Sequence, residues 1–224
     1  MNKLYVVGSS SKIAESIERL SGDNFYSVFF GRSNPLNLKH YIQYSGINNE
    51  DSVDELEDLI FNDLEQSDGL ETVSLVILSG VSTNDWRESY LVNEYLPAKL
   101  SENFAKKVSD LDVENCSIVL ISSSAAYQGA KLSYATTKAS LTGVLRTIAK
   151  DYKNKVRINI ILPSAFDSGM VADWDDIKRS VVAEGNFIGR LGTSDDMADA
   201  ILFAIKNRFI TNSIINMTGG TIRI

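Results

Sequence analysis

The stretch LYVVGSSSKIA, residues 4–14, decides the fold of this chain. Its first four residues are apolar, as in a strand buried on both faces, and Gly8 opens a turn. Apolar residues then recur at Ile13, Ile17 and Leu20, the spacing of one helix face. A strand, a glycine turn and a helix in immediate succession predict the first unit of an α/β sheet.

The same alternation of apolar strands and amphipathic helices continues to the end of the chain. Because strands that are apolar throughout lie in parallel sheets covered on both faces, the pattern predicts a doubly wound, Rossmann-type parallel sheet. No repeat or linker divides residues 1–224, so a single α/β domain is expected. Further strands are expected at residues 25–30, 41–44, 73–78, 117–121, 156–162 and 214–217, and further helices at 48–66, 85–108, 134–153 and 194–205.

Composition excludes several classes of function. The 224 residues carry a formal net charge of −7, which disfavours nucleic-acid partners, because these are bound by clustered Lys and Arg. His40 is the only histidine, so neither a histidine-rich metal site nor a Ser-His-Asp triad is expected. Cys116, the only cysteine, is expected to be a buried core thiol in a reducing compartment, the cytoplasm. No apolar run reaches membrane-spanning length.

Small and polar residues follow one predicted strand after another. They occur at 8–11, 31–33, 79–80, 122–124 and 163–168. In an open parallel sheet, the carboxyl ends of the strands meet at one edge, and ligands bind there. We therefore expect a binding crevice at this edge.

Tyr134 and Lys138 stand four residues apart at the start of a predicted helix, which places a phenol and an ammonium on one face. A cation about 5 Å from a phenol, at an effective dielectric constant near 20, favours the phenolate by roughly 3 kcal/mol. Such a pair can exchange protons with a substrate. Alone, the spacing is a weak signal, because a half-buried ring beside a solvated charge has the same pattern.

Further motifs occur in a fixed order along the chain. They are Gly8 to Ala14 (family pattern G-x-x-x-G-I-G), Ser79-Gly80, Asn93, Ile121-Ser122-Ser123, Tyr134 to Lys138 (Y-x-x-x-K), Pro163-Ser164, Gly189-Arg190-Leu191-Gly192 and Thr218-Gly219-Gly220. With this ordered set, the chain resembles the short-chain dehydrogenase/reductase family over nearly its whole length. The resemblance implies a nicotinamide dinucleotide cofactor and oxidoreductase activity.

The resemblance assigns catalytic roles to four residues. Tyr134 would transfer a proton to or from the substrate oxygen, and Lys138 would lower the pKa of that phenol and bind the nicotinamide ribose. Ser123 would donate a hydrogen bond to the substrate oxygen, and Asn93 would hold a water molecule that links Lys138 to solvent. Two alternatives stay open: the register of the serine run could shift by one residue, and Asn93 could be a solvent-facing or neighbour-bonding amide.

The resemblance also implies a dinucleotide site. The first turn would bind the pyrophosphate, with Lys12 and Ala14 in place of two family glycines, and we expect Lys12 to contact a phosphate. Where NAD enzymes place a carboxylate after the second strand, this chain has Arg32, which could pair with a 2′-phosphate or be a plain surface residue. NADP(H) is the expected cofactor, with NAD(H) possible. The expected cofactor-binding residues are Gly8, Ser10, Ser11, Lys12, Ile13, Arg32, Ser33, Ser79, Gly80, Tyr134, Lys138, Pro163 and Ser168.

Two segments beside the expected substrate pocket, 80–93 and 123–134, are shorter than the family pattern. We therefore expect an open cleft that suits a bulky or carrier-borne substrate, or a site that has lost turnover. The polar segment 166–190 is expected to be irregular and to act as a lid, and its acidic residues disfavour strongly anionic substrates at that edge.

These expectations combine into an NADP(H)-dependent oxidoreductase that interconverts a carbonyl and a secondary alcohol on a small or medium metabolite. The rival hypothesis is a catalytically inactive regulator or scaffold that keeps the dinucleotide-binding fold. The altered glycine turn favours the rival, and the complete set of Asn93, Ser123, Tyr134 and Lys138 opposes it. By resemblance, a homo-oligomer, either a dimer or a tetramer, is expected through the helices that begin near Asp85 and Tyr134.

Overall fold

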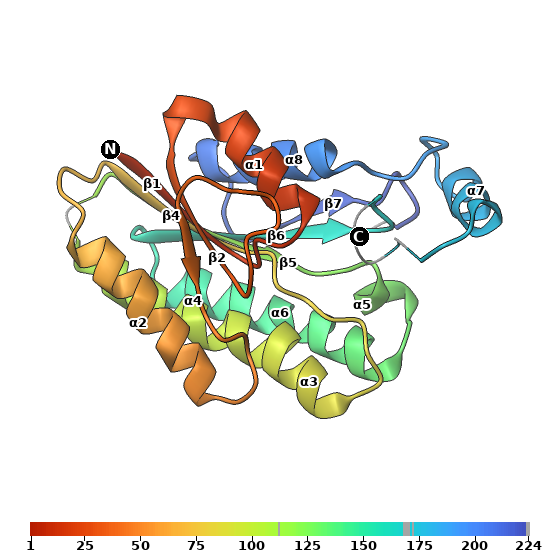
Figure 1. Ribbon diagram of the computed structural model, residues 1–224, viewed down its shortest axis with the longest axis horizontal. Coiled ribbons are helices and arrows are strands. Elements are labelled where there is room, and N and C mark those ends of the chain that lie inside the picture. The colour runs from red at the N-terminus through yellow and green to blue at the C-terminus, as the bar shows by residue number, and fades with distance from the viewer. Residues whose placement is uncertain (112, 168–170, 172, 223–224) are drawn as a thin grey trace.

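Seven parallel strands form one sheet with helices on both faces in the computed structural model of the chain (Figure 1). The structure describes residues 1–111, 113–167, 171 and 173–222. The strand order is β3-β2-β1-β4-β5-β6-β7, and each neighbouring pair is parallel. The predicted doubly wound α/β fold is confirmed, and the order reverses between β1 and β4, where such sheets bind ligands.

Most strands and helices begin and end within three residues of their predicted positions. The strands are β1 (Asn2–Val7), β2 (Tyr26–Gly31), β3 (Tyr41–Gln43), β4 (Thr72–Ile77), β5 (Asn115–Ile121), β6 (Val156–Pro163) and β7 (Ser213–Met217). The helices are α1 (Lys12–Ser21), η1 (Gly22–Asn24), α2 (Asp51–Glu65), α3 (Trp86–Tyr90), η2 (Leu91–Tyr95), α4 (Leu96–Ser109), α5 (Ala125–Gln128), α6 (Leu132–Asp151), α7 (Asp176–Glu184) and α8 (Ser194–Lys206).

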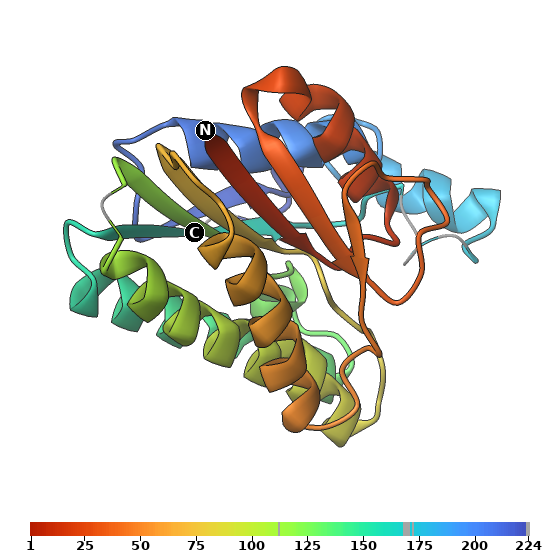
Figure 2. The same cartoon turned by 60° about the vertical axis from the view of Figure 1, so that its left-hand side comes forward.

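Two apolar layers cover the sheet. α1 and α8 pack on one face, and α2, α4 and α6 pack on the other, as the two views in Figures 1 and 2 agree. Alternate residues of one strand enter the two layers: in β1, Tyr5 contributes to the α2–α4–α6 side and Leu4 to the α1–α8 side. This double burial explains why the strands are apolar throughout. Cys116 lies in the core, as predicted, and burial raises the pKa of its thiol to about 11.

The helix predicted over residues 85–108 is interrupted by the π-turn η2, between α3 and α4. Pro97 gives a physical reason, because it lacks the N–H that an α-helix would donate to the carbonyl of Asn93, four residues earlier. Asn93 lies at the centre of the π-turn and is fully buried. Such turns are frequent at functional sites.

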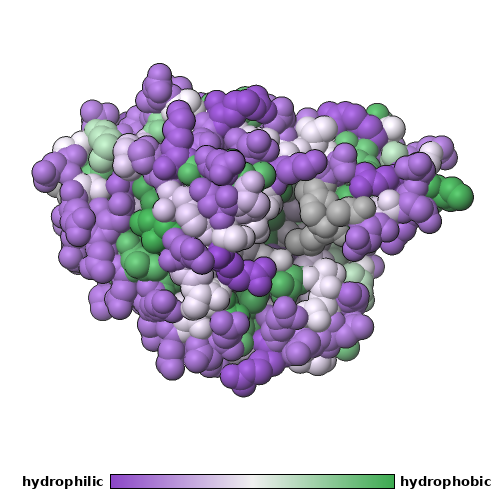
Figure 3. All heavy atoms as spheres, in the orientation of Figure 1, coloured by the Kyte–Doolittle hydropathy of each residue, from purple (hydrophilic) through white to green (hydrophobic). Residues whose placement is uncertain are grey.

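The prediction that residues 166–190 are irregular is wrong for α7. The Asp175 carboxylate caps this helix by accepting a hydrogen bond from the Lys178 N–H at 2.7 Å. No residue of α7 is buried, and Ile177 and Val181, which stand four residues apart, are exposed. The helix projects from the body of the molecule, and hydrophobic atoms are visible over it at the right-hand edge of Figure 3.

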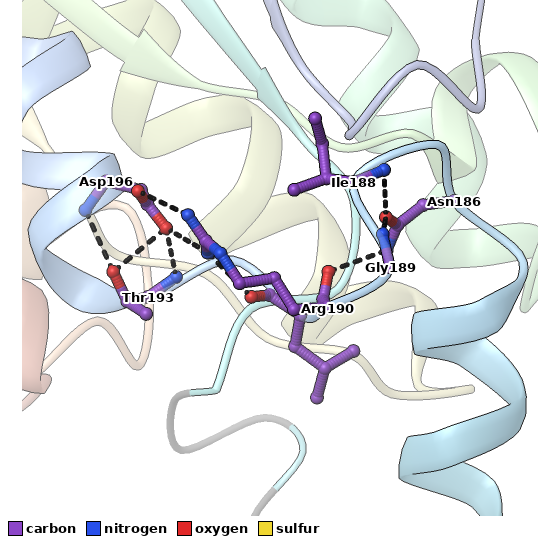
Figure 4. A network of polar contacts seen from close by, with 7 residues as sticks. Asn186, Ile188, Gly189, Arg190, Thr193 and Asp196 are labelled. Atoms are coloured by element: carbon purple, nitrogen blue, oxygen red, sulfur yellow. Dashed lines mark hydrogen bonds and ion pairs between the residues drawn. The ribbon is translucent and has the colours of Figure 1, made fainter.

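The turn between α7 and α8 is held by a polar network (Figure 4). The Asn186 side chain bonds with the backbone of this turn, including the carbonyl of Arg190 at 2.7 Å. The Arg190 guanidinium pairs with Asp196, and Thr193 and Asp196 form a capping box at the start of α8. The network fixes the carboxyl-terminal side of the segment that carries α7.

Arg157 of β6 closes the carboxyl end of α8. Its guanidinium donates hydrogen bonds at 2.6–3.0 Å to four backbone carbonyls at and beyond the end of this helix, and to the Asn115 side chain. Helix ends leave such carbonyls without partners, so this one side chain satisfies several of them and ties α8 to the sheet.

Replacing Arg157 with Met should lower the free energy of unfolding by about 3 kcal/mol, because it leaves half-buried carbonyls without a donor. Urea denaturation measures this change. The control is Arg208→Met, since Arg208 pairs with Glu114 at 3.0 Å on the surface with its side chain 60% exposed. The control should change stability by less than about 1 kcal/mol. Equal effects of the two substitutions would contradict the capping role of Arg157.

Candidate active site

A cleft of about 1150 Å³ runs along the carboxyl edge of the sheet, between the loops that follow β1, β2, β4, β5 and β6. It is the crevice expected from the small and polar residues at the strand ends. Most of the predicted site residues line it. These are Gly8, Ser10, Ser11, Ile13, Arg32, Ser79, Gly80, Ser123, Tyr134, Lys138 and Pro163.

Three predicted residues, Lys12, Ser33 and Asn93, are described and do not line the cleft. Lys12 and Ser33 are exposed and are not among the lining residues, and the phosphate contact of Lys12 stays a prediction. Asn93 is buried behind Gly80. Ser168 lies outside the described residues.

The turn at Gly8 brings bare backbone against the loop after β4. Its φ of +98° suits glycine, and a Cβ there would lie 2.6 Å from the backbone nitrogen of Ser79. The hydroxyls of Ser9 and Ser11 are buried without a hydrogen-bond partner among the described residues, and Ser11 stands at the N-cap of α1 without capping it. Unpaired hydroxyls at a helix start in a cleft fit a phosphate ligand, so these residues suit the pyrophosphate of a dinucleotide.

Lys138 carries its ammonium group into the interior. The side chain is buried, and its Nζ donates a hydrogen bond to the carbonyl of Ile121 at 2.8 Å, at the end of β5. Burial lowers the pKa of Lys138 from 10.5 to about 8. A Cβ at Gly80 would come within 3.2 Å of Nζ, so the glycine leaves the space that this ammonium occupies.

Tyr134 differs from the sequence prediction in the direction of its pKa. Burial raises the pKa of this phenol, and a hydrogen bond with Ser123 lowers it only in part. The Lys138 ammonium, which was expected to lower this pKa, is bonded to the Ile121 carbonyl and does not offset the burial. The phenol is therefore protonated at neutral pH.

The two neighbouring serines have different partners. The Ser122 hydroxyl donates to the backbone carbonyl of Lys138 at 2.9 Å and ties β5 to α6. The Ser123 hydroxyl accepts from the Ala125 N–H at 3.2 Å, and it lies close enough to the Tyr134 phenol to lower the pKa of that group in part. The geometry therefore places Ser123 beside the phenol.

The Asn93 amide holds the loop after β4. Its Oδ1 accepts from the N–H of Val81 at 2.9 Å, and its Nδ2 donates to the carbonyl of Val81 at 2.8 Å. A solvent-facing amide is excluded, because Asn93 is fully buried. The side chain thus positions Gly80 against Lys138, and its predicted water link stays a prediction.

The short segment after Val81 is fastened to the start of α6. The Lys131 ammonium donates to the carbonyl of Ser82 at 2.8 Å, and the Ser133 hydroxyl donates to the carbonyl of Thr83 at 2.7 Å. These contacts fix the wall of the cleft next to Tyr134.

The segment around α7 forms the opposite wall. Trp174 and Lys178 line the cleft, and the Lys178 ammonium lies 4.2 Å from the centre of the Trp174 ring. Arg179 pairs with Asp167 at 2.7 Å. This wall therefore carries positive charge beside its acidic residues, which weakens the predicted bias against anionic substrates.

Three further residues line the cleft near Arg32 and were not among the predicted cofactor-binding residues: Ser9, Tyr44 and Gly46. The sequence holds one signal for a site at this end: residues 31–49 contain no Asp or Glu, which favours an anionic ligand.

Within the described ranges, no three His, Cys, Asp or Glu side chains gather as a metal site would require. No helix in that part of the chain has the length and apolar character to cross a bilayer.

Comparison with known proteins establishes the family of this chain. Residues 72–221 match the family model described as enoyl-(acyl carrier protein) reductase. The chain belongs to the short-chain dehydrogenase/reductase family. Among curated proteins, it is 34% identical over 113 residues to tropinone reductase-like 3 of Erythroxylum coca, covering 47% of this chain and 43% of that protein.

A second curated relative is 3-oxoacyl-[acyl-carrier-protein] reductase FabG of Chlamydia muridarum. It is 32% identical over 108 residues, which cover 46% of this chain and 44% of the relative. The chain thus spans less than half the length of these curated relatives in the matched regions.

Solved structures of the family share the fold along the whole chain. Aldohexose dehydrogenase of Thermoplasma acidophilum superposes with a TM-score of 0.82 at 24% identity, over 100% of this chain and 95% of that one. 4-Hydroxyisoleucine dehydrogenase complexed with NADH gives 0.84 at 20% identity, over 99% and 98%. ElxO with NADP bound gives 0.83 at 18% identity, over 98% of both chains.

The buried Lys138 makes stability depend on pH. Between its folded pKa of about 8 and its ordinary value of 10.5, the unfolded chain binds a proton that the folded chain lacks, so the cost of burying this charge falls as pH rises. The unfolding free energy of the native protein, minus that of Lys138→Met, should therefore rise by about 1.4 kcal/mol per pH unit in this window.

Urea denaturation at several pH values measures this difference. Lys153→Met, which removes an exposed lysine beyond the end of α6, is the matched control. A difference for Lys138→Met that is flat from pH 8 to pH 10 would contradict the burial of its charge.

Proposed function

We propose that the protein is an NADP(H)-dependent oxidoreductase that interconverts a carbonyl and a secondary alcohol on a small or medium metabolite. The observation that carries the proposal is that Ser123, Tyr134 and Lys138 line the same cleft as the unpartnered hydroxyls of Ser9 and Ser11. A proton donor and a phosphate-binding turn thus share one crevice. Family membership and the names of the curated relatives, which are reductases, support the same reaction class.

When bound, NADP(H) supplies or accepts the hydride at C4 of its nicotinamide ring. The residues of the chain handle the proton. In reduction, the Tyr134 phenol donates its proton to the substrate oxygen, and the Ser123 hydroxyl donates a hydrogen bond to that oxygen as charge develops there. The Lys138 ammonium, held by the Ile121 carbonyl, lies on the same helix face as the phenolate that remains and stabilises it. Because burial raises the pKa of Tyr134 above its ordinary value, the phenol carries its proton at neutral pH.

The choice of NADP(H) over NAD(H) rests on Arg32. Its guanidinium suits a 2′-phosphate better than a ribose diol, and residues 31–49 provide no carboxylate for that diol. Initial rates with both dinucleotides at matched concentrations measure the preference. We expect a clear excess with NADPH, and near-equal rates would contradict this choice.

The substrate is proposed to be a medium-sized carbonyl compound, free or attached to a carrier. The cleft is lined by the segment after Val81 and by Phe166, Trp174 and Val182. These apolar walls suit a hydrocarbon portion next to the carbonyl group. A panel of short and long 3-oxo compounds tests this class, and activity confined to small polyols would contradict it.

We also propose a homo-oligomer in a reducing compartment, the cytoplasm. Trp86 and Tyr90 of α3 and Leu132 of α6 are large hydrophobic residues exposed on neighbouring helices. Covering such side chains is a common reason for association. Sedimentation equilibrium measures the state, and a monomer at micromolar concentration would contradict the oligomer.

Replacing Tyr134 with Phe should lower turnover at least about a hundredfold, because the proton donor is lost. Affinity for the dinucleotide should change by less than about twofold, since the ring remains. The assay follows the absorbance of reduced cofactor over a panel of ketones and alcohols. The control is Tyr127→Phe, an exposed phenol of α5 outside the cleft lining, which should keep its rate.

Two results would overturn the proposal. A Tyr134→Phe protein that keeps most of its rate would remove Tyr134 from the chemistry. Tight dinucleotide binding without turnover of any compound in the panel would favour the inactive regulator or scaffold.

A further inference from the structure

The adenosine end of the cleft has an unpaired positive charge. Arg32 lines this end and forms no ion pair with any described residue. The described carboxylates that line the cleft are Glu88 of α3 and Asp173 before α7, and the whole segment 31–49 contains none. The guanidinium therefore has no internal partner to neutralise it, which suits an anionic ligand.

Gly46 leaves space for the aliphatic part of the Arg32 side chain. Its φ of +92° lies in the left-handed region, and its backbone runs directly beside the arginine side chain. A Cβ at this position would lie 2.7 Å from Cδ, 3.1 Å from Cγ and 3.9 Å from Nε of Arg32. Contacts shorter than 3 Å between carbon atoms are repulsive, so any side chain at position 46 must displace the arginine.

The backbone on both sides of this contact is also fixed. The Gln43 side-chain amide donates to the carbonyl of Arg32 at 3.0 Å, and the Tyr44 N–H donates to the carbonyl of Gly31 at 3.1 Å. Burial raises the pKa of the Tyr44 phenol, while a hydrogen bond with Ser79 and the nearby Arg32 charge lower it in part. The Arg32 side chain thus lies near the buried phenol of Tyr44 and against the backbone of Gly46.

A second observation points to a ligand at this place. The Ser9 side chain is 1% exposed, lines the cleft, and has no hydrogen-bond partner among the described residues. Its hydroxyl lies next to Gly31, because a Cβ there would fall 2.3 Å from the Ser9 oxygen. A buried hydroxyl without a partner is costly, and a ligand oxygen beside Arg32 would satisfy it.

We propose that Gly46 is a positioning residue for cofactor specificity, whose bare backbone holds the Arg32 guanidinium where it binds a phosphate on the 2′-oxygen of adenosine. The inference rests on the proposed use of NADP(H). It adds that specificity depends on the space beside Arg32 as well as on its charge. A planar guanidinium can offer two N–H groups to one phosphate, and a side chain at position 46 that displaces the arginine changes this geometry.

Calorimetric titration with two small probes tests the proposal. Adenosine 2′,5′-bisphosphate carries the 2′-phosphate, and adenosine 5′-monophosphate lacks it. The native chain should bind the bisphosphate more tightly. Gly46→Ala should weaken binding of the bisphosphate by about tenfold or more, the range of a charge-assisted hydrogen bond, and change binding of the monophosphate by less than about twofold.

Gly69→Ala is the matched control for backbone strain. Gly69 also has a left-handed φ of +61°, but nothing lies within 4 Å of a Cβ built there. This variant should bind both probes as the native chain does. If Gly46→Ala does not fold, as judged by circular dichroism, Gly46→Asn places the same Cβ beside Arg32, and Asn tolerates the left-handed region better.

A double-mutant cycle tests whether Gly46 acts through Arg32. Arg32→Ala alone should abolish the preference for the bisphosphate, and adding Gly46→Ala should cause no further loss. Additive losses, an equal loss for both probes, or no preference in the native chain would overturn the proposal. These titrations measure binding and need no turnover. A negative result in them therefore does not contradict the proposed role of Tyr134, and a negative result for Tyr134→Phe does not contradict the proposed role of Gly46.

Discussion

The ammonium group of Lys138 donates a hydrogen bond to the carbonyl of Ile121 deep inside the molecule. Removing a charge from water is unfavourable, and the depressed pKa of Lys138 reflects this. Three elements therefore meet at the ammonium group. α6 carries Lys138, β5 ends at the Ile121 carbonyl that accepts its hydrogen bond, and the loop after β4 places Gly80 beside it. Only a sheet that places β4 and β5 side by side provides this meeting point.

The surrounding side chains keep that point in place. Asn93 holds the backbone of Val81 from the π-turn, so that Gly80 stays against the ammonium. The Ser122 hydroxyl ties the end of β5 to α6. Burial moves the pKa values of Tyr134 and Lys138 in opposite directions, up for the phenol and down for the ammonium. A neutral phenol and a lysine with a lowered pKa thus line one cleft.

Sequence reasoning reached the fold and the cleft because both follow from local patterns. Apolar strands, helix spacing and glycine or serine strand ends are each visible in the chain. The π-turn was also within reach, since Pro97 stands four residues after Asn93 inside a predicted helix. α7 was missed because its segment is rich in charged residues, although Ile177 and Val181 stand four residues apart at helical spacing. The direction of the Tyr134 pKa shift could not be read from spacing, because it depends on how deeply the ring is buried.

At the adenosine end of the cleft, too, some features are visible in the sequence and others appear only in the fold. The lack of Asp and Glu over residues 31–49 is visible in the sequence and indicates a positive site. The contact between Gly46 and Arg32 joins residues fourteen positions apart through a left-handed backbone, and spacing alone does not show it.

Direct titration of the Lys138 ammonium tests the central claim, that this charge is buried at the strand end. Carbon-13 labelling of the lysine side chains, with Lys138→Met to assign the resonance, allows NMR to follow the group from pH 6 to pH 11. The account predicts a midpoint near pH 8. A midpoint at the ordinary lysine value of 10.5 would show that the charge lies in water, and would contradict the account.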